Sequence, residues 1–252
     1  MSAPEPAHHT RIGQRWDAYV EVPPWATRVV LAFIVLVHAL TGTYDHGRGL
    51  PWSVVILGVR SEASRLAYGA RGATEVGAGE VWRLVTCGFV HVDLVHLTLN
   101  GLALASVGHA AEVVFGPATA GFVFLISVVG GGLLSQGWGG PISSGASGGL
   151  FGLLGALVVF GLIQRRTLPP FALDLFGWRL WPWVVVNLVA GAVIPGIDHL
   201  GHVGGLLTGM SMSVVVGNRL TDHGPGAERR RAFWAAASVF LLLFGFGGWL
   251  IA

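Results

Sequence analysis

The sequence predicts an all-α, polytopic membrane protein. Of the 252 residues, 53% are hydrophobic and only 11% are charged, whereas soluble globular domains carry about 25% charged residues. The apolar residues also gather in long blocks, which is the pattern of membrane-spanning helices. A soluble fold of this length would need far more polar surface than this chain supplies.

Seven apolar blocks indicate seven spans. They are Ala26–Tyr44, Val92–Phe115, Thr119–Gln136, Ser147–Leu162, Leu180–Ile194, Gly201–Val216 and Ala232–Ile251. Several are shorter than the roughly 20 residues that cross a bilayer upright. The polar segment 1–25 precedes the first block, and no apolar core begins before Val29. We therefore expect the first block to be a retained span and not a cleaved signal.

The arginines predict the orientation. All fifteen basic residues are arginine, and ten of them flank the spans on the side that holds the N-terminus. The other five lie in one long first loop, residues 45–91, where the positive-inside rule gives charge less weight. We expect a cytoplasmic N-terminus and an external C-terminus. Arginines confined to loops and flanks do not indicate a nucleic-acid partner, and the lone Cys87 excludes an internal disulfide or a cysteine-rich zinc site.

The long first loop is predicted to contain further structure. The stretch Trp52–Ala70 mixes apolar residues with Arg60, Glu62 and Arg65. This pattern is typical of a short amphipathic helix on a membrane surface. A helix within a solvated loop fits the pattern equally well.

Three polar segments interrupt the apolar blocks. They are Gly145-Ala146-Ser147-Gly148, His96-Leu97-Thr98-Leu99-Asn100 and Gly201-His202-Val203-Gly204-Gly205. Polar residues inside a membrane are costly, so each segment is a candidate functional site. Each segment taken alone also fits close helix packing through small residues, or hydrogen bonding between helices.

Helix lengths place two of these polar residues at one depth. Ser147 lies eighteen residues before Arg165, and His202 lies seventeen residues before Arg219. At about 1.5 Å per residue these spacings are about 27 and 26 Å, close to the thickness of the hydrocarbon layer. Ser147 and His202 are therefore predicted to lie level near the outer face, each in the first turn of its helix.

Glycines favour contact between these two helices, because bare glycine faces allow close approach. Gly148 follows Ser147, and Gly205 and Gly209 follow His202. His202 would then act as general base toward the Ser147 hydroxyl. His96 and Asn100 share one helix face, and with the Ser147 backbone N–H they would supply the donors of an oxyanion hole.

The order and spacing of these motifs resemble the rhomboid family. The resemblance includes Gly79-Glu80-Val81-Trp82-Arg83-Leu84-Val85-Thr86, Phe89-Val90-His91, His96-x-x-x-Asn100, Glu112 with Gly116, Gly145-x-Ser147-Gly148 and His202-x-x-Gly205-x-x-x-Gly209. It extends from about Ala26 to Gly217, or about three-quarters of the chain.

The resemblance implies a serine protease core of six transmembrane helices, residues 26–217. A linker, 218–231, and a seventh span, 232–252, would follow it. Ser147 and His202 would form a dyad without a third acidic member or a cofactor. Its substrates would be transmembrane proteins in the lipid bilayer, cut near the outer face after entering past the fifth span. Trp82 and Arg83, in a loop partly in the outer leaflet, Glu112 and the motif glycines Gly145, Gly148, Gly205 and Gly209 would support the site.

The sequence also fits some alternatives. His199 competes with His202 for the role of base, although the glycine offsets fit only His202. Asp198 would orient a histidine or, as we favour, cap the sixth span. His199-x-x-His202 would make half of a metal site. The rival classes are an inactive rhomboid relative that binds membrane clients and a transporter. The arginine-only basic content favours a bacterial plasma membrane.

Overall fold

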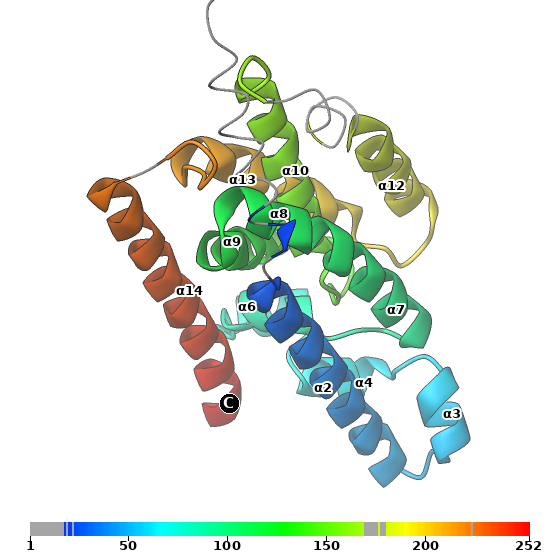
Figure 1. The fold of residues 1–252 in the computed structure, drawn as a ribbon. Helices are drawn as coiled ribbons and strands as arrows, with labels where there is room; N and C mark the ends of the chain where they lie inside the picture. The colour runs from blue at the N-terminus through cyan, green and yellow to red at the C-terminus, as the bar shows by residue number, and fades with distance from the viewer. Residues whose placement is uncertain (1–17, 19, 22, 169–175, 177–179, 223) are drawn as a thin grey trace, which may run out of the picture.

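The chain is all-helical over the residues that the computed structural model describes, which are 18, 20, 21, 23–168, 176, 180–222 and 224–252 (Figure 1). Most of the predicted N-terminal segment, 1–25, lies outside these residues. Within them, the predicted apolar blocks all form helices. They are α2 (Trp25–Gly47), α7 (Leu94–Ala103) with α8 (His109–Phe115), α9 (Pro117–Gly137), α10 (Ser147–Ile163), α12 (Trp181–Val193), α13 (His199–Val215) and α14 (Pro225–Ile251).

Within the described residues, four helical segments are long and apolar enough to cross a membrane. They are Trp25–Gly47, Leu94–Phe115, Pro117–Gly137 and Pro225–Ile251. The apolar helices α10 and α12 are shorter. The protein is thus a multi-pass integral membrane protein, as its composition predicts.

The second span contains an irregular turn. A π-helical turn, η2 (Leu104–Gly108), separates α7 from α8. At the end of the span, Glu112 is 3% exposed and accepts hydrogen bonds from the N–H groups of Ala26 (3.3 Å) and Thr27 (2.6 Å). These donors belong to the first turn of α2, so Glu112 caps the N-terminus of a neighbouring helix. Gly116 then turns the chain into α9 with a φ of +85°.

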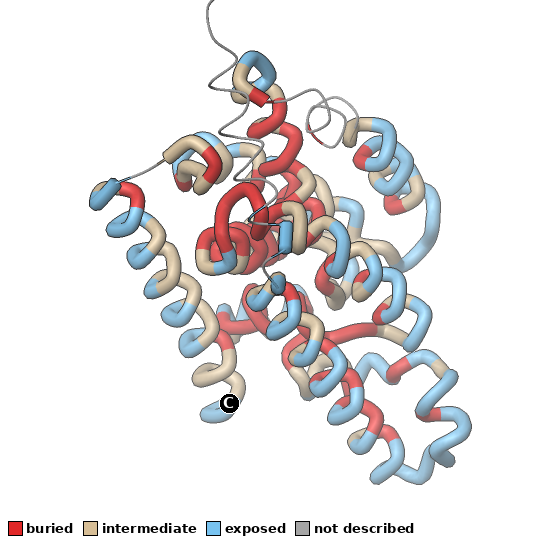
Figure 2. The backbone as a smooth tube through the Cα atoms, in the orientation of Figure 1, coloured by how far each residue is buried: buried red, intermediate tan, exposed pale blue. Residues whose placement is uncertain are grey.

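The buried centre is formed by α9, α10 and α13, which pack on one another. In Figure 2, α9 and α10 are buried over much of their length, whereas α12 and α14 expose much of their surface. Gly205 and Gly209 of α13 face the backbone carbonyls of Gly148 and Gly152 on α10. A Cβ atom at either α13 position would overlap the facing oxygen. This contact lets the two helices approach backbone to backbone.

The first loop does not contain the single helix predicted over Trp52–Ala70. It contains two short helices there, α3 (Trp52–Leu57) and α4 (Glu62–Ala67). Gly58 ends α3 in an extended conformation, and the Ser61 side chain caps α4 by accepting a hydrogen bond from the Ser64 N–H. The prediction of a single helix was wrong because apolar periodicity does not reveal the helix end at Gly58 or the helix cap at Ser61. Three further short elements follow, α5 (Ala73–Gly77), α6 (Arg83–Thr86) and the 3₁₀ turn η1 (Cys87–Phe89).

The seventh helix begins earlier than predicted and supports the first loop. α14 starts at Pro225, a residue suited to the first helical position, so residues 225–231 of the predicted linker are helical. It packs against α9 and α6. Gly248 lies against the Trp82 ring, and Trp249 Nε1 donates a hydrogen bond to the Ala67 carbonyl at 2.9 Å.

Candidate active site

Ser147 is the first residue of α10, and the turn before it is held on several sides. Gly145 has a φ of +130°, which favours glycine, and a side chain there would collide with the His96 ring. Its N–H donates to the Cys87 carbonyl at 2.9 Å. The N–H of Ala146 points to His91 Nε2 at 3.4 Å. The first loop therefore fixes the position of the residue that precedes Ser147.

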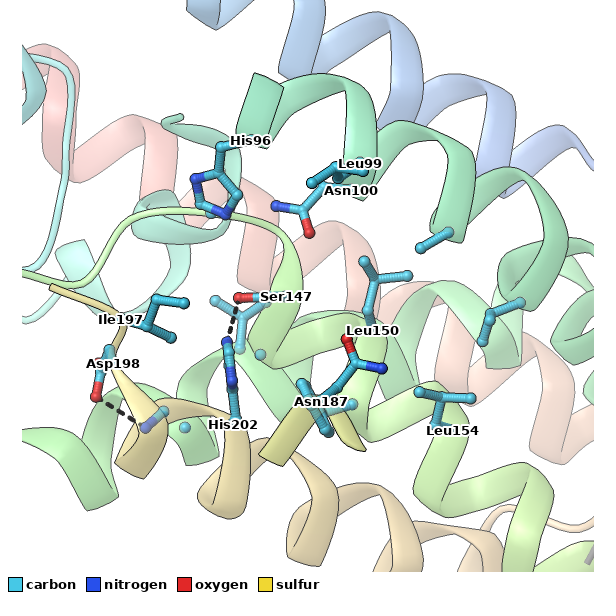
Figure 3. A pocket seen from close by; sticks show the side chains of 18 of the residues that line it. His96, Leu99, Asn100, Ser147, Leu150, Leu154, Asn187, Ile197, Asp198 and His202 are labelled. Atoms are coloured by element: carbon cyan, nitrogen blue, oxygen red, sulfur yellow. Dashed lines mark hydrogen bonds between the residues drawn. The ribbon is translucent and has the colours of Figure 1, made fainter. Parts of the chain in front are cut away.

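His202 lies opposite, in the first turn of α13. Its Nε2 is 2.8 Å from Ser147 Oγ, and Figure 3 shows the imidazole pointing directly at the hydroxyl. The ring stacks on Phe151 of α10, with centroids 4.5 Å apart and an interplanar angle of 22°. Its other nitrogen, Nδ1, is buried without a hydrogen-bond partner among the described residues. Aromatic stacking thus orients the ring from the side.

Asp198 and His199 lie at the start of α13, before His202. Asp198 Oδ1 accepts a hydrogen bond from the Gly201 N–H at 2.9 Å and so caps α13, which agrees with the reading that we favour from the sequence. His199 is exposed at the start of the same helix. Of His199 and His202, the histidine that is hydrogen-bonded to Ser147 is His202.

His96 and Asn100 face the serine from α7 (Figure 3). Asp93 caps this helix by accepting the His96 N–H at 2.7 Å. Asn100 is 7% exposed, and its Nδ2 is buried without a partner among the described residues. The Ser147 N–H, at the first position of a helix, has no acceptor within that helix. Donors without internal partners therefore lie near the serine.

A large cavity of about 1310 Å³ joins these groups. Ser147, His202, His96 and Asn100 all line it, and it extends between α7, α8, α10 and α12. Along that path the lining is mostly apolar, with leucines of α10 such as Leu154. A cavity with a few polar groups in a mostly apolar lining is typical of a binding site.

The predicted supporting residues separate into two groups. The four motif glycines lie at the turn before Ser147 or at the α10–α13 contact. Trp82, Arg83 and Glu112 lie away from the dyad and brace the fold. Arg83 binds Glu80 at 2.6 Å, donates to the Ala70 carbonyl at 3.0 Å, and lies 4.5 Å over the Trp82 ring.

Two residues at the site had no predicted role. His91 contacts the turn before Ser147 and is fully buried. Arg71 is also fully buried, although arginine in a long polar loop is usually solvated. For His91 the only sequence signal was its place in the family motif, and for Arg71 there was none, because its partners are distant in sequence.

A serine hydroxyl that is hydrogen-bonded to an imidazole, with unpaired N–H donors nearby, is the arrangement of a serine hydrolase. Here it lies in a multi-pass helical membrane protein. Residues 78–219, more than half of the chain, match the Rhomboid domain family. The chain therefore belongs to the rhomboid family.

Relatives include proteins named as proteases. The chain is 34% identical to Rhomboid protease GluP of Bacillus subtilis over 152 residues, which cover 60% of this chain and 29% of that protein. It is 32% identical to Rhomboid-type serine protease 2 of Emericella nidulans over 168 residues, 61% of this chain and 30% of that one. RHOMBOID-like protein 4 of Arabidopsis thaliana is 34% identical over 189 residues, 68% and 46% of the two chains. The chain matches less than half the length of each relative.

Proposed function

We propose that this protein is an intramembrane serine endopeptidase that cuts transmembrane segments of other membrane proteins near the outer membrane face. Ser147 is the nucleophile and His202 the general base. The observation that carries the proposal is the 2.8 Å hydrogen bond between Ser147 Oγ and His202 Nε2. Membership of a family with relatives named as proteases supports it.

The chemistry follows from this geometry. His202 Nε2 takes the hydroxyl proton as Ser147 Oγ attacks the scissile carbonyl carbon. The oxyanion that forms accepts hydrogen bonds from the Ser147 N–H, Asn100 and His96. His202 then gives its proton to the leaving amine, and the peptide C–N bond breaks to leave an ester on Ser147. Water, deprotonated by His202, hydrolyses this ester and regenerates the hydroxyl.

The tautomer of His202 is set by this role. To accept the serine proton, Nε2 must be unprotonated and Nδ1 must carry the hydrogen. A third, acidic residue would normally hold that Nδ1–H, whereas here the stacked Phe151 ring holds the imidazole plane. The proposal is therefore a Ser–His dyad.

Substrates enter sideways, past α12. This helix lies at the edge of the bundle (Figure 1), and among the described helices it packs mainly on α13 and α10. Trp183 and Asn187 of α12 line the cavity that contains Ser147. Movement of α12, whose Gly191 lies beside the His202 ring, opens the cavity to the membrane.

The proposal includes an orientation, with the N-terminus cytoplasmic and the C-terminus outside, in a bacterial plasma membrane. The positive-inside rule supports it. It places Ser147 near the outer face, as cleavage there requires.

The test is purification in detergent, with a panel of single-span substrates offered to the wild type and to Ser147→Ala. We expect the wild type to cleave at least one substrate and the variant to cleave none while remaining folded. Turnover by the purified variant would contradict Ser147 as nucleophile. A wild type that binds these spans and neither cleaves them nor reacts with a serine-directed probe would instead be a client-binding relative.

A further inference from the structure

Arg71 is a buried cation in the first loop, between α4 and α5. It is 0% exposed. Burial of an isolated charge costs several kcal/mol, so a buried guanidinium needs partners for its donors. The partners of Arg71 come from segments far along the chain, and they precede both members of the proposed dyad.

One set of partners belongs to the segment before Ser147. The Arg71 guanidinium donates to the carbonyl oxygens of Gly140, at 3.2 Å, and of Pro141. The Arg71 backbone pairs with Ser143 through two hydrogen bonds of 2.9 Å, one in each direction. Side chain and backbone together therefore hold the loop that ends at the nucleophile.

A second partner precedes His202. Asp198 Oδ2 lies 3.8 Å from the Arg71 guanidinium and has no hydrogen-bond partner among the described residues. The other oxygen of this carboxylate caps α13 through Gly201, and the Asp198 carbonyl accepts the His202 N–H at 3.2 Å. Arg71 is thus the counter-charge to the residue that begins the base-bearing helix.

A third set fixes the guanidinium itself. Ser135 Oγ and Gln136 Oε1, at the end of α9, accept hydrogen bonds of 2.9 and 3.0 Å. Because α9 packs on both α10 and α13, the cation is anchored to the buried centre of the bundle. The two terminal nitrogens of the guanidinium reach all these acceptors, whereas Nε is buried without a partner among the described residues. The single ammonium of a lysine cannot reproduce this forked geometry.

We propose that Arg71 is a positioning residue of the active site. It sets the separation and alignment of Ser147 and His202 by holding the start of each helix from one point. This inference rests on the proposed function of the dyad and adds a residue to it. Loss of Arg71 should therefore impair the chemical step more than substrate binding.

Arg60 provides a matched control. It is also a buried arginine of the first loop, 5% exposed, and it donates to the Val55 carbonyl and to His38. These partners tie α3 to α2 and lie outside the segments that precede Ser147 and His202. Arg60→Met should therefore destabilise the loop without moving the dyad.

The experiment compares Arg71→Lys, Arg71→Met and Arg60→Met in purified protein, at a temperature below the melting temperature of each. For both Arg71 variants we expect kcat to fall by about 10- to 100-fold, the typical effect of a displaced reacting group, with KM within about twofold of wild type. Arg60→Met should lower the melting temperature but keep kcat per folded molecule. Equal effects of Arg71→Met and Arg60→Met on kcat per folded molecule would overturn the proposal.

A milder variant keeps the test valid if Arg71→Met fails to fold. Asparagine also caps helices, so Asp198→Asn removes the charge and keeps the cap of α13. If Arg71 acts partly through Asp198, the double variant Arg71→Lys with Asp198→Asn should lose less kcat than the product of the single losses. Independent, multiplying losses would contradict that link.

One readout separates this inference from the proposed function. The nitrogen-15 resonances of the His202 ring, assigned by their loss in His202→Ala, report its bond to Ser147 whether or not the protein cleaves any substrate. They should shift in Arg71→Lys and stay in place in Arg60→Met. Unchanged His202 resonances in folded Arg71→Lys would refute the positioning role, whereas an inactive wild type with shifted resonances in Arg71→Lys would refute only the protease proposal.

Discussion

At the scale of residues, the site is a small set of polar groups. Some are hydrogen-bonded to one another, and others have no partner among the described residues. Ser147 Oγ and His202 Nε2 are hydrogen-bonded to each other at 2.8 Å. Asn100 Nδ2, beside them, is buried without a partner among the described residues. A buried donor without an acceptor costs free energy, so its retention is explained if a reacting group supplies the acceptor during catalysis.

Asn100 and His96 should therefore matter to turnover more than to stability. We expect Asn100→Ala and His96→Ala each to lower kcat by up to about 10²–10³-fold, the usual effect of losing one oxyanion donor. The loss is smaller where the Ser147 N–H compensates. Steady-state kinetics with circular dichroism as the folding control would check this. Wild-type turnover in both folded variants would exclude the oxyanion role.

His91, in the first loop outside the spanning helices, predicts an acid sensitivity. Its burial, with a smaller effect from nearby His96, lowers the pKa of His91 to about 3 from the usual 6.5. Between these two pH values the unfolded chain binds a proton that the folded chain does not, so the free energy of unfolding falls as pH decreases from 6.5 toward 3. Above pH 6.5 this contribution is constant.

Thermal unfolding in detergent between pH 7.5 and 4.5 measures the effect. His91→Gln should show a shallower decrease in melting temperature with acidification than the wild type. His199→Gln, at an exposed position, should keep the wild-type slope. Identical slopes in the wild type and His91→Gln would show that His91 is not held neutral by the fold.

At the scale of elements, the contact between α10 and α13 brings Ser147 and His202 together. Gly205 and Gly209 face the backbone of α10 so closely that a side chain has no space. The presence of the long apolar helices and this glycine contact follow from sequence, since they depend on local apolar blocks and on spacing within one helix. The two-helix structure of Trp52–Ala70 and the partners of Arg71 do not, because they depend on contacts between segments distant in sequence.

A larger residue at this contact should separate the dyad. Gly209→Leu would force its side chain against the Gly152 carbonyl, and overpacking of this kind costs about 1–3 kcal/mol. We expect a lower melting temperature and loss of most activity. Gly247→Leu on α14 is the control, because nothing lies within 4 Å of a Cβ there. If Gly209→Leu retained wild-type activity, close approach of α10 and α13 would not be required.

At the scale of the whole molecule, the cavity that holds Ser147 and His202 lies between the helices of an apolar bundle. The proposed function places a water-dependent reaction there. The cavity is bordered by α12, and beside the serine it is lined by two small residues, Gly145 and Gly148. A substrate that enters sideways from the membrane arrives as a helix, with its peptide groups already hydrogen-bonded. The scissile carbonyl must leave helical geometry before Ser147 can attack it.

Cleavage should therefore depend on how easily the substrate helix unwinds near its outer end. Glycine and proline weaken a helix by about 1 and 3 kcal/mol relative to alanine, so substrates that contain them should be cut faster. We also expect a small residue just before the cut. A series of single-span substrates that differ only in these residues tests this, and equal cleavage of an all-leucine span and a glycine-containing span would contradict it.

The most direct measurement of the central claim, a serine activated by His202, is the rate and position of covalent labelling by a fluorophosphonate probe. Mass spectrometry of the labelled protein identifies the modified residue without any knowledge of the natural substrate. We predict an adduct on Ser147 in the wild type and in His199→Ala, and labelling that is lost or slowed by orders of magnitude in His202→Ala. A label on another residue, or equal labelling of Ser147 in the wild type and His202→Ala, would contradict the account.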